Sequence, residues 1–117
     1  MMQKLARMSV ALAVGTLLAC AGSISAVAQG SGLAGLHTQV RVGNKICFLD
    51  HYHNGSSSGR KSRKEAEAAA ISDWASFTSW EYGSAWGQFG LAESKSISCS
   101  NVGGWGCQLE ARPCRRR

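Results

Sequence analysis

The segment GSSSGRKS, at residues 55–62, comes close to the phosphate-binding P-loop pattern G-x-x-x-x-G-K-[ST]. The match is incomplete, because only three residues separate its glycines and Arg60 stands before Lys61. A nucleotide-binding domain also needs a parallel sheet covered by helices, for which 117 residues leave little room. We therefore expect no nucleotide site in this segment.

A weaker anion site can still be drawn at the same place. A helix that begins just after the loop would offer free backbone amides to an anion. Four basic side chains lie beside those amides, namely Arg60, Lys61, Arg63 and Lys64. The alternative is a solvated loop followed by a well-capped helix.

The histidines of Asp50-His51-Tyr52-His53 are the second candidate. In an extended strand His51 and His53 would point to the same side, and two imidazoles at this spacing can hold zinc or copper. A closed site needs three or four ligands, so His37 or a carboxylate would have to complete it. Two histidines at a strand end are more often only polar, which makes metal binding a secondary hypothesis.

Asp73 is the third candidate, because it falls near the centre of the apolar stripe of the predicted helix described below. A buried carboxylate needs a partner or a raised pKa. In a functional interpretation, Asp73 acts with His51 or His53 as an acid/base, a metal ligand or, with a nearby serine, a hydrolase triad. The plainer interpretation is a structural salt bridge or a hydrogen bond from the helix to the sheet.

A second basic cluster lies at the C-terminus. The two clusters together hold seven of the 13 lysines and arginines of a chain whose formal charge is +6. Basic exported proteins often meet anionic glycans, lipid phosphates or nucleic acid, and we favour glycans or lipid headgroups because no aromatic-plus-basic strand pattern indicates nucleic acid. This C-terminal cluster consists of Arg115, Arg116 and Arg117.

The strongest prediction of secondary structure is a helix from Ser62 to Tyr82. Ser62-Arg63-Lys64-Glu65 has the pattern of a capping box, and Gly83 supplies the usual stop. At helical spacing, one apolar stripe is predicted to cover a sheet. It contains Ala66, Ala69, Ala70, Trp74, Phe77 and Trp80.

The other elements are predicted to be strands. Residues 40–52 predict a strand broken at Gly43-Asn44, and residues 53–61 a polar loop. Residues 85–91 and 95–100 predict one long bent strand, and residues 105–111 the last one. The predicted fold class is therefore α+β, a small β-α-β-β domain with one amphipathic helix on an antiparallel sheet.

Four of the five cysteines, Cys47, Cys99, Cys107 and Cys114, lie in the predicted domain. An even number in a small exported chain implies disulfides, each worth roughly 2–4 kcal/mol. Cys99 and Cys107 would face each other across the last hairpin, which leaves Cys47 to Cys114. A one-residue shift of the hairpin register would favour another pairing, so the alternatives stay open.

Residues 1–28 have the features of an export signal, with Lys4 and Arg7 before an apolar run and Ala26-Val27-Ala28 as a cleavage site. The apolar run is shorter than the span of about 20 residues that crosses a membrane. A lipoprotein is the alternative, because Leu17-Leu18-Ala19-Cys20 fits a lipobox with Cys20 lipidated. We expect a periplasmic or secreted protein with a flexible lead-in at residues 29–39 and a single domain at residues 40–117.

Three motifs carry a resemblance to a known group. They are A-x-x-A-A-I-x-x-W from Ala66, Y-G-x-x-W from Tyr82, and the cysteine pattern that ends in A-x-P-C at Cys114. This combination resembles small exported alphaproteobacterial proteins that are largely uncharacterised. The resemblance covers about half of the chain, and it implies an envelope or secreted setting and no particular activity.

The sequence thus favours a small basic exported protein that binds anionic envelope or extracellular ligands without catalysis or cofactor. The alternatives are a periplasmic metal-binding protein that uses His51 and His53, and a small hydrolase that uses Asp73 with a histidine.

Overall fold

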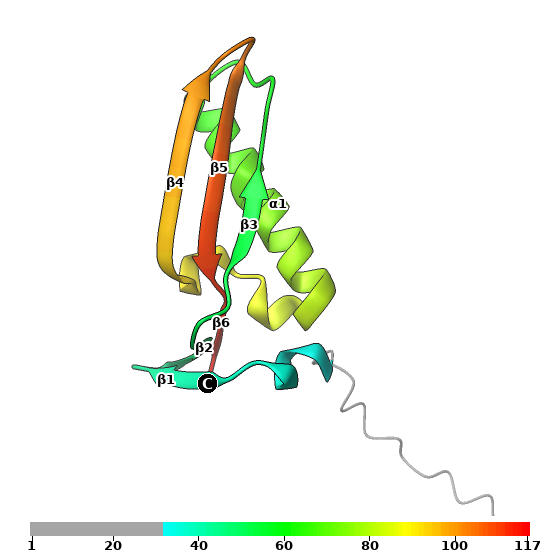
Figure 1. The fold of residues 1–117 in the computed structure, drawn as a ribbon, viewed down its shortest axis with the longest axis vertical. Coiled ribbons are helices and arrows are strands. Elements are labelled where there is room, and N and C mark those ends of the chain that lie inside the picture. The colour runs from blue at the N-terminus through cyan, green and yellow to red at the C-terminus, as the bar shows by residue number, and fades with distance from the viewer. Residues whose placement is uncertain (1–31) are drawn as a thin grey trace, which may run out of the picture.

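The computed structural model describes residues 32–117, which form one long helix and two small antiparallel sheets (Figure 1). The predicted α+β class is confirmed, although two sheets replace the single sheet that the sequence predicted. The predicted export signal and Cys20 lie outside the described residues.

The larger sheet has the strand order β3-β5-β4 and packs on the helix α1. Its strands are His53–Ser56, Glu93–Asn101 and Trp105–Arg112, numbered β3, β4 and β5. The core between sheet and helix contains Trp74, Leu109, Ala111 and the disulfide sulfur of Cys107. Within the described part of the chain, residues 32–117, no helix covers the opposite face of this sheet, which is drawn toward the viewer in Figure 1.

The smaller sheet lies at the foot of the molecule and has the order β1-β2-β6 (Figure 1). Its strands are Gln39–Val42, Lys45–Phe48 and Cys114–Arg116. Buried Pro113 separates β6 from β5, and its carbonyl accepts a hydrogen bond from the amide of Phe48 at 3.1 Å. A second core cluster joins this sheet to the end of the helix through Phe48, Tyr82 and Trp86.

The helix α1, Arg63–Tyr82, has the predicted start and stop. The Ser62 hydroxyl accepts from the amide of Glu65 at 3.1 Å, and Gly83 ends the helix with a φ of 99°. In a capping box the Glu65 carboxylate would accept from the amide of Ser62 itself. Here it accepts from the preceding amide, that of Lys61, at 3.2 Å.

The predicted apolar stripe is right at the first turns of α1 and wrong at its end. Phe77 is 48% exposed and Trp80 is 80% exposed. The sheet follows the ridge of every fourth residue, and this ridge drifts around the helix away from Phe77 and Trp80. The buried positions are Ala66, Ala70, Trp74, Thr78 and Tyr82.

Three other sequence predictions need correction. Residues 85–91 form no strand but two short 3-10 helices, Ser84–Trp86 and Phe89–Leu91. These turns press Trp86 onto Phe48 and Phe89 onto Trp74, which accounts for the apolar pattern of the segment. The predicted loop at residues 53–61 contains β3, and the predicted strand at residues 40–52 is the β1–β2 hairpin followed by a non-strand segment.

Both predicted disulfides are present. Cys47–Cys114 joins β2 to β6, and Cys99–Cys107 joins β4 to β5 as a directly opposed pair. Within residues 32–117, no helix is long and apolar enough to span a membrane.

Candidate functional site

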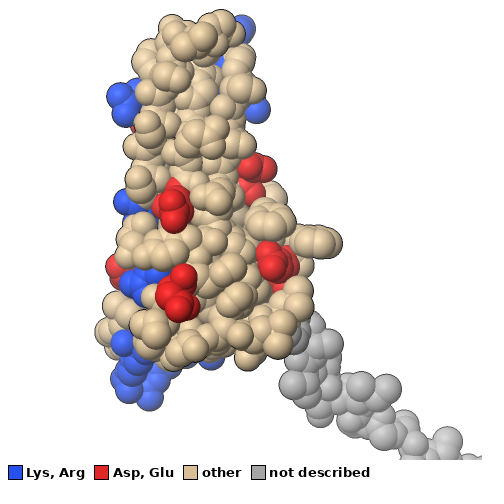
Figure 2. Space-filling model, in the orientation of Figure 1, with Lys and Arg blue, Asp and Glu red and all other residues tan. Residues whose placement is uncertain are grey.

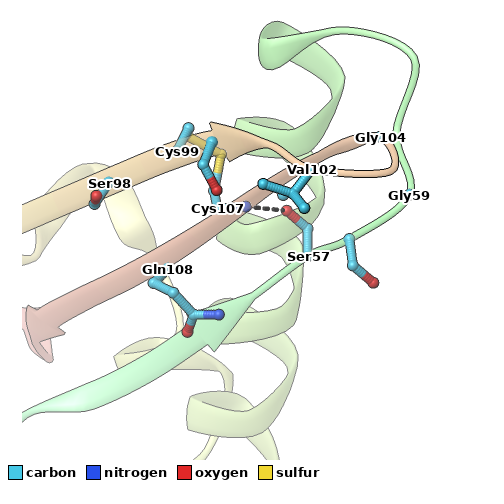
Figure 3. Close-up of a pocket in the computed structure, with 11 residues that line it drawn as sticks. Ser57, Gly59, Ser98, Cys99, Val102, Gly104, Cys107 and Gln108 are labelled. Atoms are coloured by element: carbon cyan, nitrogen blue, oxygen red, sulfur yellow. Dashed lines mark hydrogen bonds between the residues drawn. A yellow bond between two sulfur atoms is a disulfide. The ribbon is translucent and has the colours of Figure 1, made fainter.

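The segment GSSSGRKS is an extension of the β3 edge and not an open cradle for an anion. Figure 3 shows it running beside the hairpin that joins β4 to β5, where Gly59 and Gly104 are in close contact. Several of its amides donate within the protein, as does the amide of Glu65. The acceptors are Asp73 for Ser56, Cys107 for Ser57, Trp105 for Arg60, Glu65 for Lys61 and Ser62 for Glu65.

This hydrogen bonding matches the alternative of a loop with a good helix cap. The side chains of Arg60, Lys61, Arg63 and Lys64 are exposed at that end of the molecule. Arg63 pairs with Glu67 at 3.1 Å, which offsets part of the local charge. A hollow of about 280 Å³ lies next to this loop and is lined by serines, glycines and the Cys99–Cys107 disulfide (Figure 3).

The three histidines of the chain converge on the hydroxyl of Tyr82. Their Nε2 atoms lie 2.9 Å (His37), 2.8 Å (His51) and 3.3 Å (His53) from this oxygen. The rings of His37 and His51 stack with centroids 3.9 Å apart. The structure therefore brings His37 to the pair that the sequence singled out, around a tyrosine that the sequence analysis missed.

His53 is the buried member of this histidine cluster, with 4% of its surface exposed. The Thr78 hydroxyl donates to the carbonyl of Trp74 at 2.7 Å, so its oxygen accepts from Nδ1–H of His53 at 3.0 Å. The Nε2 atom of neutral His53 then lies 3.2 Å from the carboxylate of Glu81. A proton at Nε2 would complete an ion pair with Glu81, but it would also place a charge in a buried site.

Burial decides this balance in favour of the neutral form. It lowers the pKa of His53, while the nearby Glu81 carboxylate opposes the shift. The pKa of His51 is also lowered, first by burial and then by the neighbouring His37. Burial and the adjacent Glu81 carboxylate raise the pKa of Tyr82 to about 12. Burial thus favours the uncharged forms of His51 and His53.

This arrangement gives metal binding by His51 and His53 no geometric support. Within residues 32–117, no group of three or more His, Cys, Asp and Glu side chains is placed to hold a metal ion. The point on which the imidazoles converge is filled by the Tyr82 hydroxyl.

Asp73 is exposed, so the predicted burial of this carboxylate is wrong. Its Oδ2 atom accepts from the amide of Ser56 at 2.9 Å, which is the helix-to-sheet hydrogen bond of the plainer interpretation. The buried histidine, His53, contacts Thr78, Tyr82 and Glu81 instead. A hydrolase built on Asp73 and His53 therefore has no geometric support.

The C-terminal arginines belong to a basic face on the smaller sheet, at the foot of the molecule in Figure 2. Strand pairing places Lys45 opposite Arg116 and Ile46 opposite Arg115, and it places Arg41 across from Ile46 on β1. Because side chains alternate along a strand, Lys45 and Arg116 lie on one side of this sheet and Arg41 and Arg115 on the other. We use the term basic face for the whole basic end of the sheet, formed by Arg41, Lys45, Arg115, Arg116 and Arg117.

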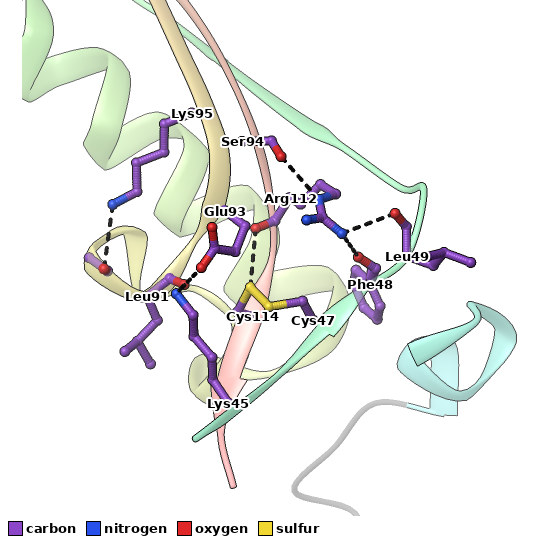
Figure 4. The surroundings of a disulfide bond; sticks show 11 residues. Lys45, Cys47, Phe48, Leu49, Leu91, Glu93, Ser94, Lys95, Arg112 and Cys114 are labelled. Carbon is purple, nitrogen blue, oxygen red and sulfur yellow. Dashed lines mark hydrogen bonds and ion pairs between the residues drawn. A yellow bond between two sulfur atoms is a disulfide. The ribbon is translucent and has the colours of Figure 1, made fainter. Parts of the chain in front are cut away.

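Several contacts hold the basic face in place (Figure 4). The Cys47–Cys114 disulfide lies beside it and fixes β6 against β2. Lys45 pairs with Glu93 at 2.5 Å and donates to the carbonyl of Leu91, and this pairing offsets its repulsion from the opposed Arg116. The guanidinium of Arg115 lies over the Trp86 ring at 5.6 Å from the centroid.

Arg112 has a structural role instead. Its Nη1 donates to the carbonyls of Phe48 and Leu49, at 2.8 and 3.0 Å, and ties the larger sheet to the end of β2.

The two predicted basic clusters lie at opposite ends of α1. A helix of 20 residues is about 30 Å long, so the clusters cannot form one compact patch. The sequence analysis missed Arg41 and Lys45 as members of the basic face. The predicted Cys47–Cys114 bond contained the signal, because it brings the strand of Lys45 beside the C-terminal arginines.

Comparisons of the chain with family models, with curated proteins and with solved structures found no match.

Proposed function

We propose that this protein is an exported, non-catalytic binding module whose basic face holds anionic groups of envelope polymers or lipid headgroups. The observation that carries the proposal is that β6 is a strand. Its arginines are fixed beside Arg41 and Lys45 by pairing with β2 and by the Cys47–Cys114 disulfide.

Fixed cations bind more tightly than cations on a free tail, because less conformational entropy is lost when the complex forms. Glu93 already neutralises Lys45, so the unpaired charge comes chiefly from the arginines. An arginine guanidinium donates to phosphate, sulfate or carboxylate groups with paired N–H bonds. A multivalent anion that wraps this end of the smaller sheet would therefore meet several directed donors.

The proposed setting is the periplasm or the cell exterior, which agrees with two disulfides in a small domain. Cleavage after Ala28, or lipidation at Cys20, is part of the same proposal. A mass spectrum of the protein purified from its own compartment distinguishes the two by the mass at the N-terminus.

The test is a comparison of two sets of substitutions at opposite ends of the molecule. Binding of fluorescein-labelled dextran sulfate, and of vesicles of phosphatidylglycerol, is measured by anisotropy and by sedimentation at low salt. The triple variant Arg115→Ser, Arg116→Ser, Arg117→Ser should weaken binding by at least about tenfold, or roughly 1.4 kcal/mol.

The matched control is Arg60→Ser, Lys61→Ser, Lys64→Ser, which removes the same number of charges at the other end of α1 and should weaken binding much less. Equal losses in the two variants would show that net charge decides binding, and the proposed role of the basic face would be wrong. The polymer and the vesicles distinguish a glycan-like from a lipid ligand.

A further inference from the structure

Three side chains that the sequence predicted to be buried are exposed together on one flank of α1. Asp73, Phe77 and Trp80 are spaced by four and three residues, which places them on the same side of the helix. The rings of Phe77 and Trp80 stack with centroids 6.3 Å apart and 21° between their planes. A pair of large exposed aromatic rings is the kind of surface that marks a binding site.

A polar hollow lies next to this pair. It has a volume of about 300 Å³, and Phe77 and Asp73 form its helix side. Its strand side comes from β3 and β5, with Asn54, Ser56 and Gln108. A second hollow of about 180 Å³ shares Asn54 and Gln108 and continues to β4.

Strand register arranges the polar side chains of the two hollows in two rows across the sheet. Asn54, Glu110 and Ser96 form one row, because β5 pairs with both of its neighbours at this level. The other row consists of Ser56, Gln108 and Ser98. Amides and hydroxyls of this kind can both donate and accept hydrogen bonds.

The Asp73 carboxylate is held in a fixed direction at the rim. The amide of Ser56 donates to its Oδ2 atom at 2.9 Å. Since a carboxylate oxygen accepts more than one hydrogen bond, the rest of the carboxylate can accept from a ligand.

The charge of this surface excludes the ligands of the basic face. Among the described residues that line the two hollows, the charged side chains are Asp73 and Glu110, both acidic. In Figure 2 the basic side chains lie along the margins and at the foot of the molecule, and most of the surface between them is uncharged. An anionic ligand would be repelled here, and a mainly apolar ligand would leave the polar rows without partners.

We infer that this surface binds a neutral saccharide. Hydroxyl groups of a sugar would exchange hydrogen bonds with the two polar rows and donate to Asp73, and a sugar ring would lie against Phe77 and Trp80. Hollows lined by aromatic rings and a few fixed polar groups are the usual form of small-ligand sites. This site is independent of the proposed function, because the basic face lies on the other sheet.

The test is a titration of the full chain with three neutral hexasaccharides, namely β-1,4-linked glucose, β-1,4-linked N-acetylglucosamine and α-1,4-linked glucose. Tryptophan fluorescence and amide NMR shifts report binding, and we expect a Kd of about 1 mM or lower for at least one sugar. The shifted amides should lie in β3, β5 and the end of α1. Trp80→Ala and Gln108→Ala should each weaken binding by at least about threefold, with an unchanged melting temperature because both side chains are exposed.

Val102→Ala is the matched control, because it removes an apolar side chain that is 87% exposed at the far hairpin. The control should bind like the unchanged protein, as should the variant that lacks Arg115, Arg116 and Arg117. The inference is overturned if none of the three sugars produces a shift up to about 10 mM. It is also overturned if Trp80→Ala and Gln108→Ala keep full affinity for the sugar, or if the shifted amides cluster on the basic face.

Discussion

At the scale of single residues, Tyr82 determines how the two halves of the protein are joined. Its hydroxyl donates to the Glu81 carboxylate, and it is then free to accept from imidazole N–H groups. His37 and His51 come from the segment around the smaller sheet, and His53 begins the larger one. Since Nδ1–H of His53 donates to Thr78, Nε2 of this neutral ring has no proton to donate to Tyr82. The buried hydroxyl therefore ties the segments of His37 and His51 to the end of α1.

The shifted pKa values of His51 and His53 predict a stability that falls in acid. Both values are lowered by burial, so the folded protein binds protons less readily than the unfolded chain. The free energy of unfolding should be highest above the ordinary histidine pKa of about 6.5 and should fall as the pH drops through the lowered values. Urea titrations at a series of pH values between about 5 and 8 check this.

The control for this prediction is His51→Gln, which keeps a hydrogen-bonding side chain but cannot take up a proton. This variant should lose less stability between neutral and acid pH than the unchanged protein. A stability that rises in acid would contradict the lowered pKa values of His51 and His53.

The sequence pattern indicated His51 and His53 as candidates, but it did not indicate Tyr82 as their partner. The pattern Asp50-His51-Tyr52-His53 draws attention at once, whereas Tyr82 looks like one more apolar position at a helix end. The approach of His37 depends on the turn between η2, Gly32–Leu36, and β1, and a contact of this kind is not visible in local periodicity. The predicted burial of Asp73 was wrong for a related reason, because the exposure of this side chain depends on the path of the sheet across the helix.

At the scale of elements, the close packing of β3 on α1 depends on Gly55. A Cβ atom at this position would lie 2.3 Å from the carbonyl oxygen of Ala70 and 2.8 Å from the Cβ of Trp74. These are backbone and rigid atoms, so the strand would have to move away from the helix. Gly55, the first glycine of the P-loop-like segment GSSSGRKS, is thus required for the packing of β3 on α1.

Gly55→Ala should therefore lower the free energy of unfolding by about 2–4 kcal/mol, as overpacked core positions do. Gly90→Ala is the matched control, because a Cβ atom there would meet nothing within 4 Å, and its effect should stay within about 0.5 kcal/mol. Urea denaturation of both variants measures the difference. Equal stabilities would mean that β3 does not pack on α1 as described.

Local sequence signals predicted both ends of the helix correctly. The prediction was wrong where long-range contacts determine the structure. The cap at Ser62 and the stop at Gly83 are properties of a few neighbouring residues, so both could be read from the sequence. Trp86 and Phe89 gave residues 85–91 the apolar and aromatic composition of a strand, but each packs on a distant ring, Phe48 or Trp74. Composition alone cannot separate such a pair of turns from a strand.

At the scale of the whole molecule, the two disulfides should differ in their contribution to stability. Cys47–Cys114 closes a separation of 67 residues and Cys99–Cys107 only 8. The chain-entropy relation then gives about 4 kcal/mol for the first bond and about 2.5 kcal/mol for the second. Paired Cys→Ala variants, compared by urea denaturation, should show this order.

The reverse order would mean that the smaller sheet keeps its place without the Cys47–Cys114 bond. The basic face would then depend on strand pairing alone, and the disulfide would not be needed to position Arg115 and its neighbours.

The salt dependence of binding tests the proposed function most directly. We predict that the affinity of the unchanged protein for dextran sulfate falls steeply between about 50 and 300 mM salt, because several contacts release counterions. The slope of log Kd against log salt should be smaller in the variant that lacks Arg115, Arg116 and Arg117 than in the variant that lacks Arg60, Lys61 and Lys64. An affinity that does not depend on salt, or no binding at low salt, would contradict the proposal that the basic face binds anions.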